Sequence, residues 1–145
     1  MYLPLSIDIT DKKILMVGGG KVATHKLKAL LQFQADVTVL SPKICKEIKA
    51  LKLTWIEAKY QASFLRDYFL VYACTNDSVV NQKIKTDCAK EKIGVNVADN
   101  AKLSDFISPA IYVQGEMSVA VSSQGKKIKQ AILWRDKIEK LFKGR

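Results

Sequence analysis

The sequence contains few of the residues that build metal centres and disulfide frameworks. There are three cysteines and one histidine among 145 residues. Cys45, Cys74 and Cys88 are odd in number and lack metal-type or redox-type spacing, so we expect reduced thiols in a cytoplasmic protein. No cluster of cysteine, histidine and acidic residues has metal-ligand spacing, and we therefore expect no metal site. His25, the only histidine, lies on the side of a predicted helix away from its apolar stripe, which favours a surface or packing role over a catalytic one.

Long apolar runs and acidic residues are scarce as well. No apolar run approaches the length of a membrane span, and residues 1–8 lack the basic leader and apolar core of a signal peptide, so we expect no membrane partner. The 14 acidic residues are outnumbered by 24 lysines and arginines, which gives a formal net charge of +10. Such a charge favours anionic partners. Nucleic acid is not expected among them, because aromatic residues are not interleaved with the lysines.

Length and hydrophobic content agree with one compact domain. A chain of 145 residues, 48% of them hydrophobic, can bury a core but is too short for two full domains. Apolar runs alternate with helical patterns through the first two thirds of the chain, which predicts an α/β fold with a doubly wound parallel sheet of the Rossmann type. The expected strands are 14–17, 37–40, 54–58, 69–74 and 93–98, and helical patterns cover 23–31, 44–51 and 80–88.

A glycine-rich turn, Gly18–Ala23, follows the first apolar run and opens a helical pattern. In that order the G-x-G-x-x-G/A pattern is typical of dinucleotide binding. Gly18 suits a tight turn, and Gly20 lets the main chain approach a pyrophosphate, because neither has a Cβ. The start of the helix offers N–H groups and a positive dipole end to phosphates. A turn that only packs a helix on a sheet is the alternative. The candidate cofactor-binding residues here are Gly18, Gly20, Lys21 and Val22.

Further cofactor contacts are expected where the other parallel strands end, because ligands of such sheets lie beyond the carboxyl ends of the strands. In dinucleotide-binding domains the second strand usually ends at an aspartate or glutamate, whose carboxylate bonds the ribose hydroxyls. The segment Leu40–Lys43 has none, so the choice between NAD and NADP is open, and Lys43 is compatible with a 2′-phosphate. The candidate residues at these strand ends are Ser41, Pro42, Lys43, Thr75, Asn76 and Val97.

Asp99 is the carboxylate that we favour for proton transfer. It follows the fifth expected strand, and a base placed there lies where it can reach a proton of a bound substrate. From the residues alone, capping of a turn by Asp99 and Asn100 is an equal alternative. Asp105 competes for the catalytic role, but its apolar neighbours favour a capping or surface position.

The segment Ser122–Lys127 combines hydroxyl groups, a glycine and lysines just before the last predicted helix. Hydroxyls and a helix N-terminus favour anions, and lysines strengthen such a site. We therefore take Ser123, Lys126 and Lys127 as candidate substrate-binding residues. The alternative is an ordinary helix start with a solvated basic face.

The pattern changes after Pro109. Residues 110–113 and 117–122 are expected to form two short strands, and a helix with a wide apolar stripe is expected from about Lys126 to Phe142. We therefore divide the chain into a Rossmann domain, 1–108, and an appended region, 109–145. That region is too small to build its own core. Its apolar helix favours self-association into a homodimer.

Seven segments of the chain match one family in order. They are Leu3–Leu5, Val17–Ala23, Ala35–Val39, Ala73–Asp77 with Asn81, Val95–Asp99, Phe106–Ala110 and Ala120–Ser123. Together they resemble the precorrin-2 dehydrogenase domain of siroheme synthases, over nearly the whole chain. Their joint occurrence is far more specific than the glycine motif alone.

The resemblance implies NAD-dependent oxidation of precorrin-2 to sirohydrochlorin, on the way to siroheme or another modified tetrapyrrole. It places the family's essential aspartate on Asp99 and its tetrapyrrole-site serine on Ser123. A substrate with many carboxylates also accounts for the basic charge. The resemblance implies a homodimer too, with a dimerisation region, 109–145, shorter than in many members. Some members also insert iron or cobalt, but the loop after Ser122 departs from the family's S-x-G-G-x-S-P pattern, which weighs against chelation.

Two other interpretations stay open. One is a nucleotide-sensing module of the kind attached to ion transporters, although such modules usually carry an acid after the second strand. The other is a relative that binds a tetrapyrrole without turning it over. Each would keep the Rossmann fold and the nucleotide site.

Overall fold

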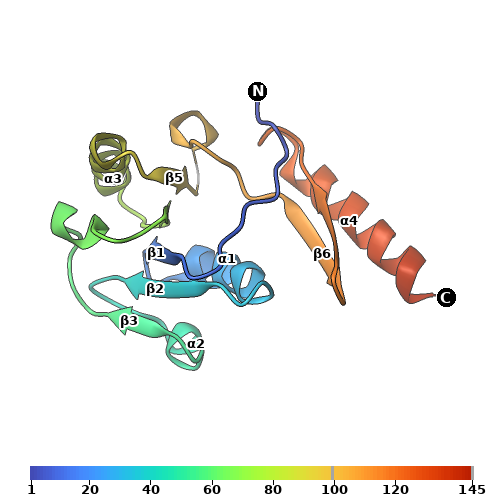
Figure 1. The fold of residues 1–145 in the computed structure, drawn as a ribbon, viewed down its shortest axis with the longest axis horizontal. Coiled ribbons are helices and arrows are strands. Elements are labelled where there is room, and N and C mark those ends of the chain that lie inside the picture. The colour runs from blue at the N-terminus through green and yellow to red at the C-terminus, as the bar shows by residue number, and fades with distance from the viewer. Residues whose placement is uncertain (99, 145) are drawn as a thin grey trace. The chain divides into compact units, whose positions relative to one another are not determined.

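The computed structural model describes residues 1–98 and 100–144, which form two compact units (Figure 1). One unit is Ile7–Phe106, and the other combines Met1–Ser6 with the chain from Ile107 onward. The division expected from the sequence, between 108 and 109, lies two residues beyond this boundary. The first six residues belong to the second unit, whereas the sequence-based division places them in the Rossmann domain.

A five-stranded parallel sheet forms the centre of the first unit. Its strands are β1 (Lys13–Val17), β2 (Asp36–Leu40), β3 (Thr54–Ile56), β4 (Leu70–Ala73) and β5 (Gly94–Val97). The spatial order is β3-β2-β1-β4-β5, and every neighbouring pair is parallel. The chain runs outward from β1 to β3 and then returns to β4 on the other side of β1. The predicted doubly wound sheet is confirmed, and the reversal beside β1 is where ligands bind in this class of fold.

Helices cover both faces of the sheet, because its central strands are apolar on both sides. One face carries α1 (Lys21–Leu31) and α2 (Lys46–Lys49), and the other carries the 3-10 helix η1 (Ala62–Leu65) and α3 (Ser78–Glu91). Met16 of β1 lies in the same buried cluster as Leu27 of α1. The next residue along the strand, Leu15, lies in the opposite cluster with Ile84 of α3. Neighbouring residues of one strand thus belong to two separate cores.

The start of α3 is set by a polar side chain, as the sequence predicts for the residues after β4. The Asp77 carboxylate accepts the N–H groups of Val79 at 2.9 Å and Val80 at 3.3 Å. This bonding satisfies two of the N–H groups that the first helical turn leaves without a partner. The helix ends at Lys92, whose φ of 57° is left-handed and stops the helix.

Regular structure is shorter than predicted toward one edge of the sheet. The helix expected over 44–51 is reduced to α2, and the strand expected over 54–58 is reduced to β3. The sequence does not predict η1 or a second 3-10 helix, η2 (Ala101–Leu103). A single turn has too few residues to show a periodic apolar pattern, which explains both omissions.

The second unit contains a hairpin and a helix, as expected. β6 (Ala110–Gln114) and β7 (Met117–Val121) pair antiparallel, and α4 (Ile128–Lys143) packs on both strands. Among the residues described in this unit, only Tyr112 and Ala131 are buried. The large apolar side chains that α4 exposes are Ile128, Ile132, Leu133, Trp134, Leu141 and Phe142. In the part of the chain that the structure describes, no helix combines the length and the apolar character needed to span a membrane.

Candidate functional site

The glycine turn after β1 is packed against the ends of two neighbouring strands. Gly18 has a φ of +125°, a conformation that L side chains rarely adopt. Its N–H donates to the carbonyl oxygen of Leu40 at 2.9 Å, and an added Cβ would lie 2.4 Å from the carbonyl oxygen of Cys74. The packing of the turn therefore requires a glycine at this position, in agreement with the tight turn that the sequence predicts.

Gly19 has a packing role that the sequence reasoning missed. A Cβ on Gly19 would lie 2.3 Å from the carbonyl oxygen of Lys43 and 2.9 Å from the Cα of Ile44. The carbonyl oxygen of Gly19 accepts the N–H of Cys45 at 2.9 Å. The loop after β2 thus rests directly on the glycine turn. No periodic or motif signal marks this contact, because it joins two loops that are distant in sequence.

Gly20 is open where the two preceding glycines are packed. No heavy atom lies within 4 Å of the place that its Cβ would take. Gly20 is the N-cap of α1, brings no side chain to cap the first turn, and is followed by a turn without acidic residues. Lys21 and Val22 are exposed beside it. The N–H groups and positive dipole end of α1 therefore fit a pyrophosphate lying over Gly20.

The loop after β2 offers two exposed residues at its surface. Ser41 is buried, and its hydroxyl donates to the carbonyl oxygen of Lys43 at 2.9 Å. The backbone of Ser41 also joins the β3 side, because its N–H donates to the carbonyl oxygen of Ile56 at 3.1 Å. Pro42 and Lys43 are exposed. Of the three candidate residues, Ser41 therefore shapes the loop, while Pro42 and Lys43 are accessible to a ligand.

Asn81 of α3 holds the loop that follows β4. Its side-chain amide donates to the carbonyl oxygen of Thr75 at 3.1 Å and accepts the Thr75 N–H at 3.3 Å. The Thr75 hydroxyl lies 2.7 Å from the same amide oxygen. Asn81 is buried, whereas Asn76 is exposed at the tip of the loop. The sequence pointed to Asn81 only through the resemblance, and the structure shows what its amide does.

The loop after β5 folds back along the free edge of that strand. The Val95 N–H donates to the Asp105 carboxylate at 3.1 Å, and the Asp105 N–H donates to the Val95 carbonyl oxygen at 2.8 Å. Asp105 also forms an ion pair with Lys85 of α3. The Asn96 side chain donates to the carbonyl oxygen of Phe106 at 2.9 Å. Asp105 therefore closes the edge of the sheet, in line with the capping role expected for it.

Val97 is tied to the same loop through its backbone. Its N–H donates to the Ser104 hydroxyl oxygen at 2.8 Å, and its carbonyl oxygen accepts the N–H of Asn100 at 3.1 Å. The Ala98 N–H donates to the carbonyl oxygen of Ala73 in β4 at 3.0 Å. The predicted catalytic residue, Asp99, lies outside the described residues. Its sequence neighbours on both sides are hydrogen-bonded to the end of the sheet.

In the second unit, the candidate anion loop is compact. The Ser123 carbonyl oxygen accepts the N–H of Lys126 at 3.0 Å, and the Ser123 hydroxyl accepts the N–H of Lys127 at 3.0 Å. These bonds explain why α4 begins later than the sequence predicts. Both lysine side chains are exposed. The loop thus brings together the three residues that the sequence singled out, a hydroxyl and two cations.

A buried carboxylate ties α3 to the chain before η1. Asp87 accepts hydrogen bonds from Lys83 at 2.7 Å and from the Tyr60 hydroxyl at 3.2 Å. The bond from Lys83 holds the pKa of Asp87 below its usual range, and burial together with this carboxylate raises the pKa of Tyr60. Burial also raises the pKa of the Cys88 thiol to about 12, so this cysteine is protonated at neutral pH and is no nucleophile. These groups stabilise the fold.

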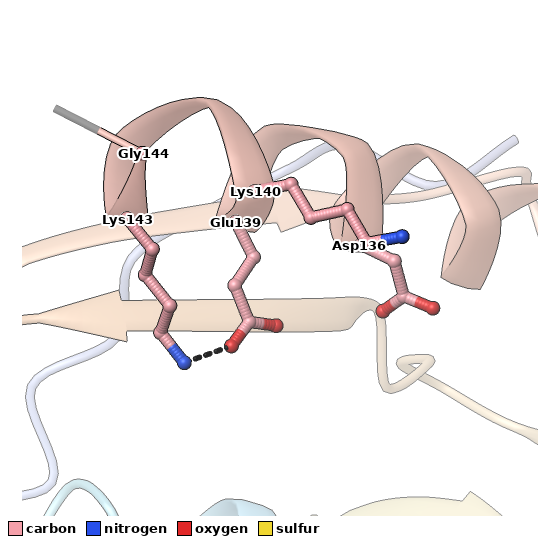
Figure 2. Close-up of a pocket in the computed structure, with 5 residues that line it drawn as sticks. All are labelled: Asp136, Glu139, Lys140, Lys143 and Gly144. Atoms are coloured by element: carbon pink, nitrogen blue, oxygen red, sulfur yellow. Dashed lines mark hydrogen bonds and ion pairs between the residues drawn. The ribbon is translucent and has the colours of Figure 1, made fainter.

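An open hollow of about 560 Å³ lies along the C-terminal end of α4 (Figure 2). It is lined by Asp136, Glu139, Lys140, Lys143 and Gly144. Lys143 bonds to Glu139 at 2.5 Å, and this bond raises the pKa of Lys143. The hollow has charges of both signs and none of the predicted site residues. Among the described residues, no group of three His, Cys, Asp or Glu side chains is placed to hold a metal ion.

A parallel sheet with a packed glycine turn and an open helix N-terminus at its reversal point defines a dinucleotide-binding domain of the Rossmann class. The model of the family described as putative NAD(P)-binding matches residues 5–110, and the chain belongs to that family. NAD is the cofactor that this membership and the site support.

Curated relatives and a solved structure add detail. The chain is 36% identical to a siroheme synthase of Photorhabdus laumondii and 34% identical to one of Buchnera aphidicola, in each case over 97% of this chain and 31% of the relative. The chain therefore spans about a third of the length of these relatives. A structure titled "SirC, precorrin-2 dehydrogenase" superposes with a TM-score of 0.82 at 27% identity, over 95% of this chain and 69% of that one.

Proposed function

We propose that this chain is a precorrin-2 dehydrogenase, which oxidises precorrin-2 to sirohydrochlorin with NAD⁺ as hydride acceptor. The observation that carries the proposal is the match to a precorrin-2 dehydrogenase structure over 95% of the chain, including both units. The open space at Gly20 supports the cofactor half of the reaction. Removal of one hydride and one proton from the substrate balances the formation of NADH.

The cofactor would bind along the carboxyl ends of the strands. Its pyrophosphate would lie over Gly20, Lys21 and Val22, where α1 offers unpaired N–H groups. The adenosine end would reach the loop at Ser41–Lys43. This loop has no acidic residue that would repel the 2′-phosphate of NADP. The nicotinamide end would reach Thr75, Asn76 and Val97, the residues that follow or end β4 and β5.

Asp99 would take the proton that leaves the substrate. Support comes from its place in the sequence, two residues after the end of β5 and between Ala98 and Asn100, which are both hydrogen-bonded to neighbouring backbone. Aspartate is ionised at neutral pH, so it can accept a proton without prior activation.

The substrate's carboxylates would bind at the loop with Ser123, Lys126 and Lys127. The two exposed lysines provide charge, and their backbone N–H groups are bonded to Ser123, which fixes the shape of the loop in the absence of a ligand. A polycarboxylate tetrapyrrole also agrees with the net charge of +10.

We further propose a homodimer in the cytoplasm. The exposed side chains of Leu133, Trp134, Leu141 and Phe142 on α4 would be covered by a second copy. A two-fold interface uses the same apolar surface on both partners, which makes it the simplest way to cover such a helix. The three cysteines form no disulfide with one another in the described part of the chain, which agrees with a reducing compartment.

The decisive experiment mixes the purified chain with NAD⁺ and precorrin-2 and follows the tetrapyrrole absorbance together with NADH formation. Sirohydrochlorin and NADH should appear in equal amounts, and neither should form without NAD⁺. Binding of NAD without turnover of precorrin-2 would instead indicate a nucleotide-sensing or tetrapyrrole-binding module.

A further inference from the structure

Gln124 makes a contact that none of the proposed roles uses. It follows Ser123 in the loop between β7 and α4, and its side-chain amide bonds to both backbone polar groups of Tyr2. The amide oxygen accepts the Tyr2 N–H, and the amide nitrogen donates to the Tyr2 carbonyl oxygen at 3.0 Å. A primary amide offers a donor and an acceptor side by side, as a neighbouring peptide group does. Gln124 therefore clamps residues that are 122 positions away in sequence.

The backbone at Gln124 is strained in a way that the clamp offsets. Its φ is 57°, in the left-handed region that non-glycine residues avoid, and the next residue, Gly125, has a φ of 71°. Two left-handed residues in succession turn the chain sharply between Ser123 and Lys126. The Gln124 side chain reaches Tyr2 from this left-handed backbone conformation, so the two hydrogen bonds to Tyr2 favour that conformation. The clamp and the shape of the loop are therefore coupled.

The rest of the second unit has its own support. α4 packs on both hairpin strands, and Arg135 donates to the carbonyl oxygen of Ile111 at 3.3 Å. Ala131 of α4 and Tyr112 of β6 are both buried. None of these contacts involves Tyr2 or Gln124. Loss of the clamp should therefore loosen the loop around Gln124 without unfolding the hairpin and helix.

We propose that Gln124 is a positioning residue for the substrate loop, which holds Ser123, Lys126 and Lys127 in the arrangement that receives the carboxylates of a polycarboxylate macrocycle. The inference rests on the proposed role of this loop and adds the N-terminal segment to its support. Gln124 acts through the backbone of its neighbours and does not itself contact the substrate.

Two substitutions separate the clamp from the backbone strain. Gln124→Met keeps roughly the length of the side chain and the left-handed backbone, but it removes both the donor and the acceptor for Tyr2 and adds no charge to the loop. Gln124→Gly removes the clamp and at the same time relieves the left-handed conformation. Gln130→Met, at an exposed glutamine on α4, is the matched control. Hydrogen exchange of the Tyr2 amide reports the clamp itself.

In both Gln124 variants the Tyr2 amide should exchange faster than in the wild type, and the KM for precorrin-2 should rise about tenfold, the effect of one or two lost hydrogen bonds. The KM for NAD and the kcat at saturation should stay at the wild-type values. In Gln130→Met the two KM values and the kcat should all stay at the wild-type values. Unchanged exchange would show that the clamp does not form in solution and would overturn the proposal. Faster exchange with an unchanged KM for precorrin-2 would also overturn it.

Binding of uroporphyrin, a polycarboxylate porphyrin, separates this proposal from the dehydrogenase assignment. Its fluorescence can be titrated with wild type and Gln124→Gly in the absence of NAD. If the wild type binds uroporphyrin about tenfold more tightly than the variant but shows no turnover of precorrin-2, the positioning role stands and the dehydrogenase activity is refuted. Equal binding by both proteins, or binding by neither, would overturn the positioning role.

Discussion

Asn81 holds Thr75 by both polar groups of its backbone, with the amide nitrogen 3.1 Å from the Thr75 carbonyl oxygen and the amide oxygen 3.3 Å from its nitrogen. This pairing joins the first turns of α3 to the loop after β4. The loop in turn carries Asn76, one of the proposed cofactor contacts. A buried amide of α3 thus determines the shape of a loop at the ligand edge of the sheet.

Asn81→Ala should therefore weaken both stability and cofactor binding. The substitution leaves backbone groups of Thr75 without their partner, which costs about 1–3 kcal/mol of unfolding free energy. Urea unfolding measures this loss, and calorimetric titration should show weaker NAD binding. Gln82→Ala, at the exposed neighbouring position, should change neither. Wild-type NAD affinity in a folded Asn81→Ala protein would contradict the proposed role of this loop.

The two glycines after Gly18 should respond in opposite ways to an added side chain. Gly19→Ala places a Cβ against the backbone of Lys43 and should destabilise the fold by about 1–3 kcal/mol. Gly20→Val meets open space in the protein and should leave the melting temperature nearly unchanged. It should lower NAD affinity about tenfold or more, because the side chain occupies the place of the pyrophosphate, a loss of about 1.4 kcal/mol or more. Calorimetry that gives equal NAD affinity for wild type and Gly20→Val would refute this site.

Asp99→Ala should separate chemistry from binding. If Asp99 is the base, turnover of precorrin-2 should fall about 10²-fold or more, while NAD binding stays nearly intact. Steady-state kinetics combined with NAD titration tests both parts. Asp105→Asn is a useful comparison, because Asp105 closes the edge of β5 and should affect stability more than kcat. Retained wild-type turnover in Asp99→Ala would exclude the catalytic role.

Charge reversal at Lys126 and Lys127 should act on the substrate alone. Replacing both with glutamate should raise the KM for precorrin-2 strongly, because like charges then face its carboxylates, and should leave the KM for NAD near the wild-type value. In the wild type, added salt should raise the KM for precorrin-2, since exposed charges are screened. A parallel rise in both KM values would indicate a folding defect instead of a substrate site.

The exposed helix α4 should produce a dimer. Sedimentation at micromolar concentration should give about twice the chain mass of 16.2 kDa. Leu133→Glu should yield a folded monomer. The side chain of Leu133 is 55% exposed in the single chain, so its replacement removes little packing within the chain. Lys137→Glu, a charge change at an exposed position of the same helix, should remain dimeric. A wild type that stays monomeric at high concentration would contradict the interface.

Local chemistry was sufficient to predict the parallel sheet, its main helices and the glycine turn. Continuous apolar strands such as 14–17, the periodic stripe of α1 and the cap at Asp77 are each properties of a short stretch of chain. The tight turn at Gly18 and the start of the helix at Gly20 could be predicted for the same reason, because each depends only on residues adjacent in sequence. The basic loop at Ser123 likewise follows from residues adjacent in sequence.

The tertiary structure decided what depends on segments that meet only after folding. Gly19 packs on Lys43, Asn81 binds Thr75, Asp105 pairs with the edge of β5, and Gln124 clamps Tyr2. In three of these contacts a side chain bonds to the backbone of another segment, and at Gly19 two backbone segments lie at van der Waals distance. A single sequence shows no periodicity for such pairs, because their separation along the chain is set by topology and not by the repeat of a helix or strand.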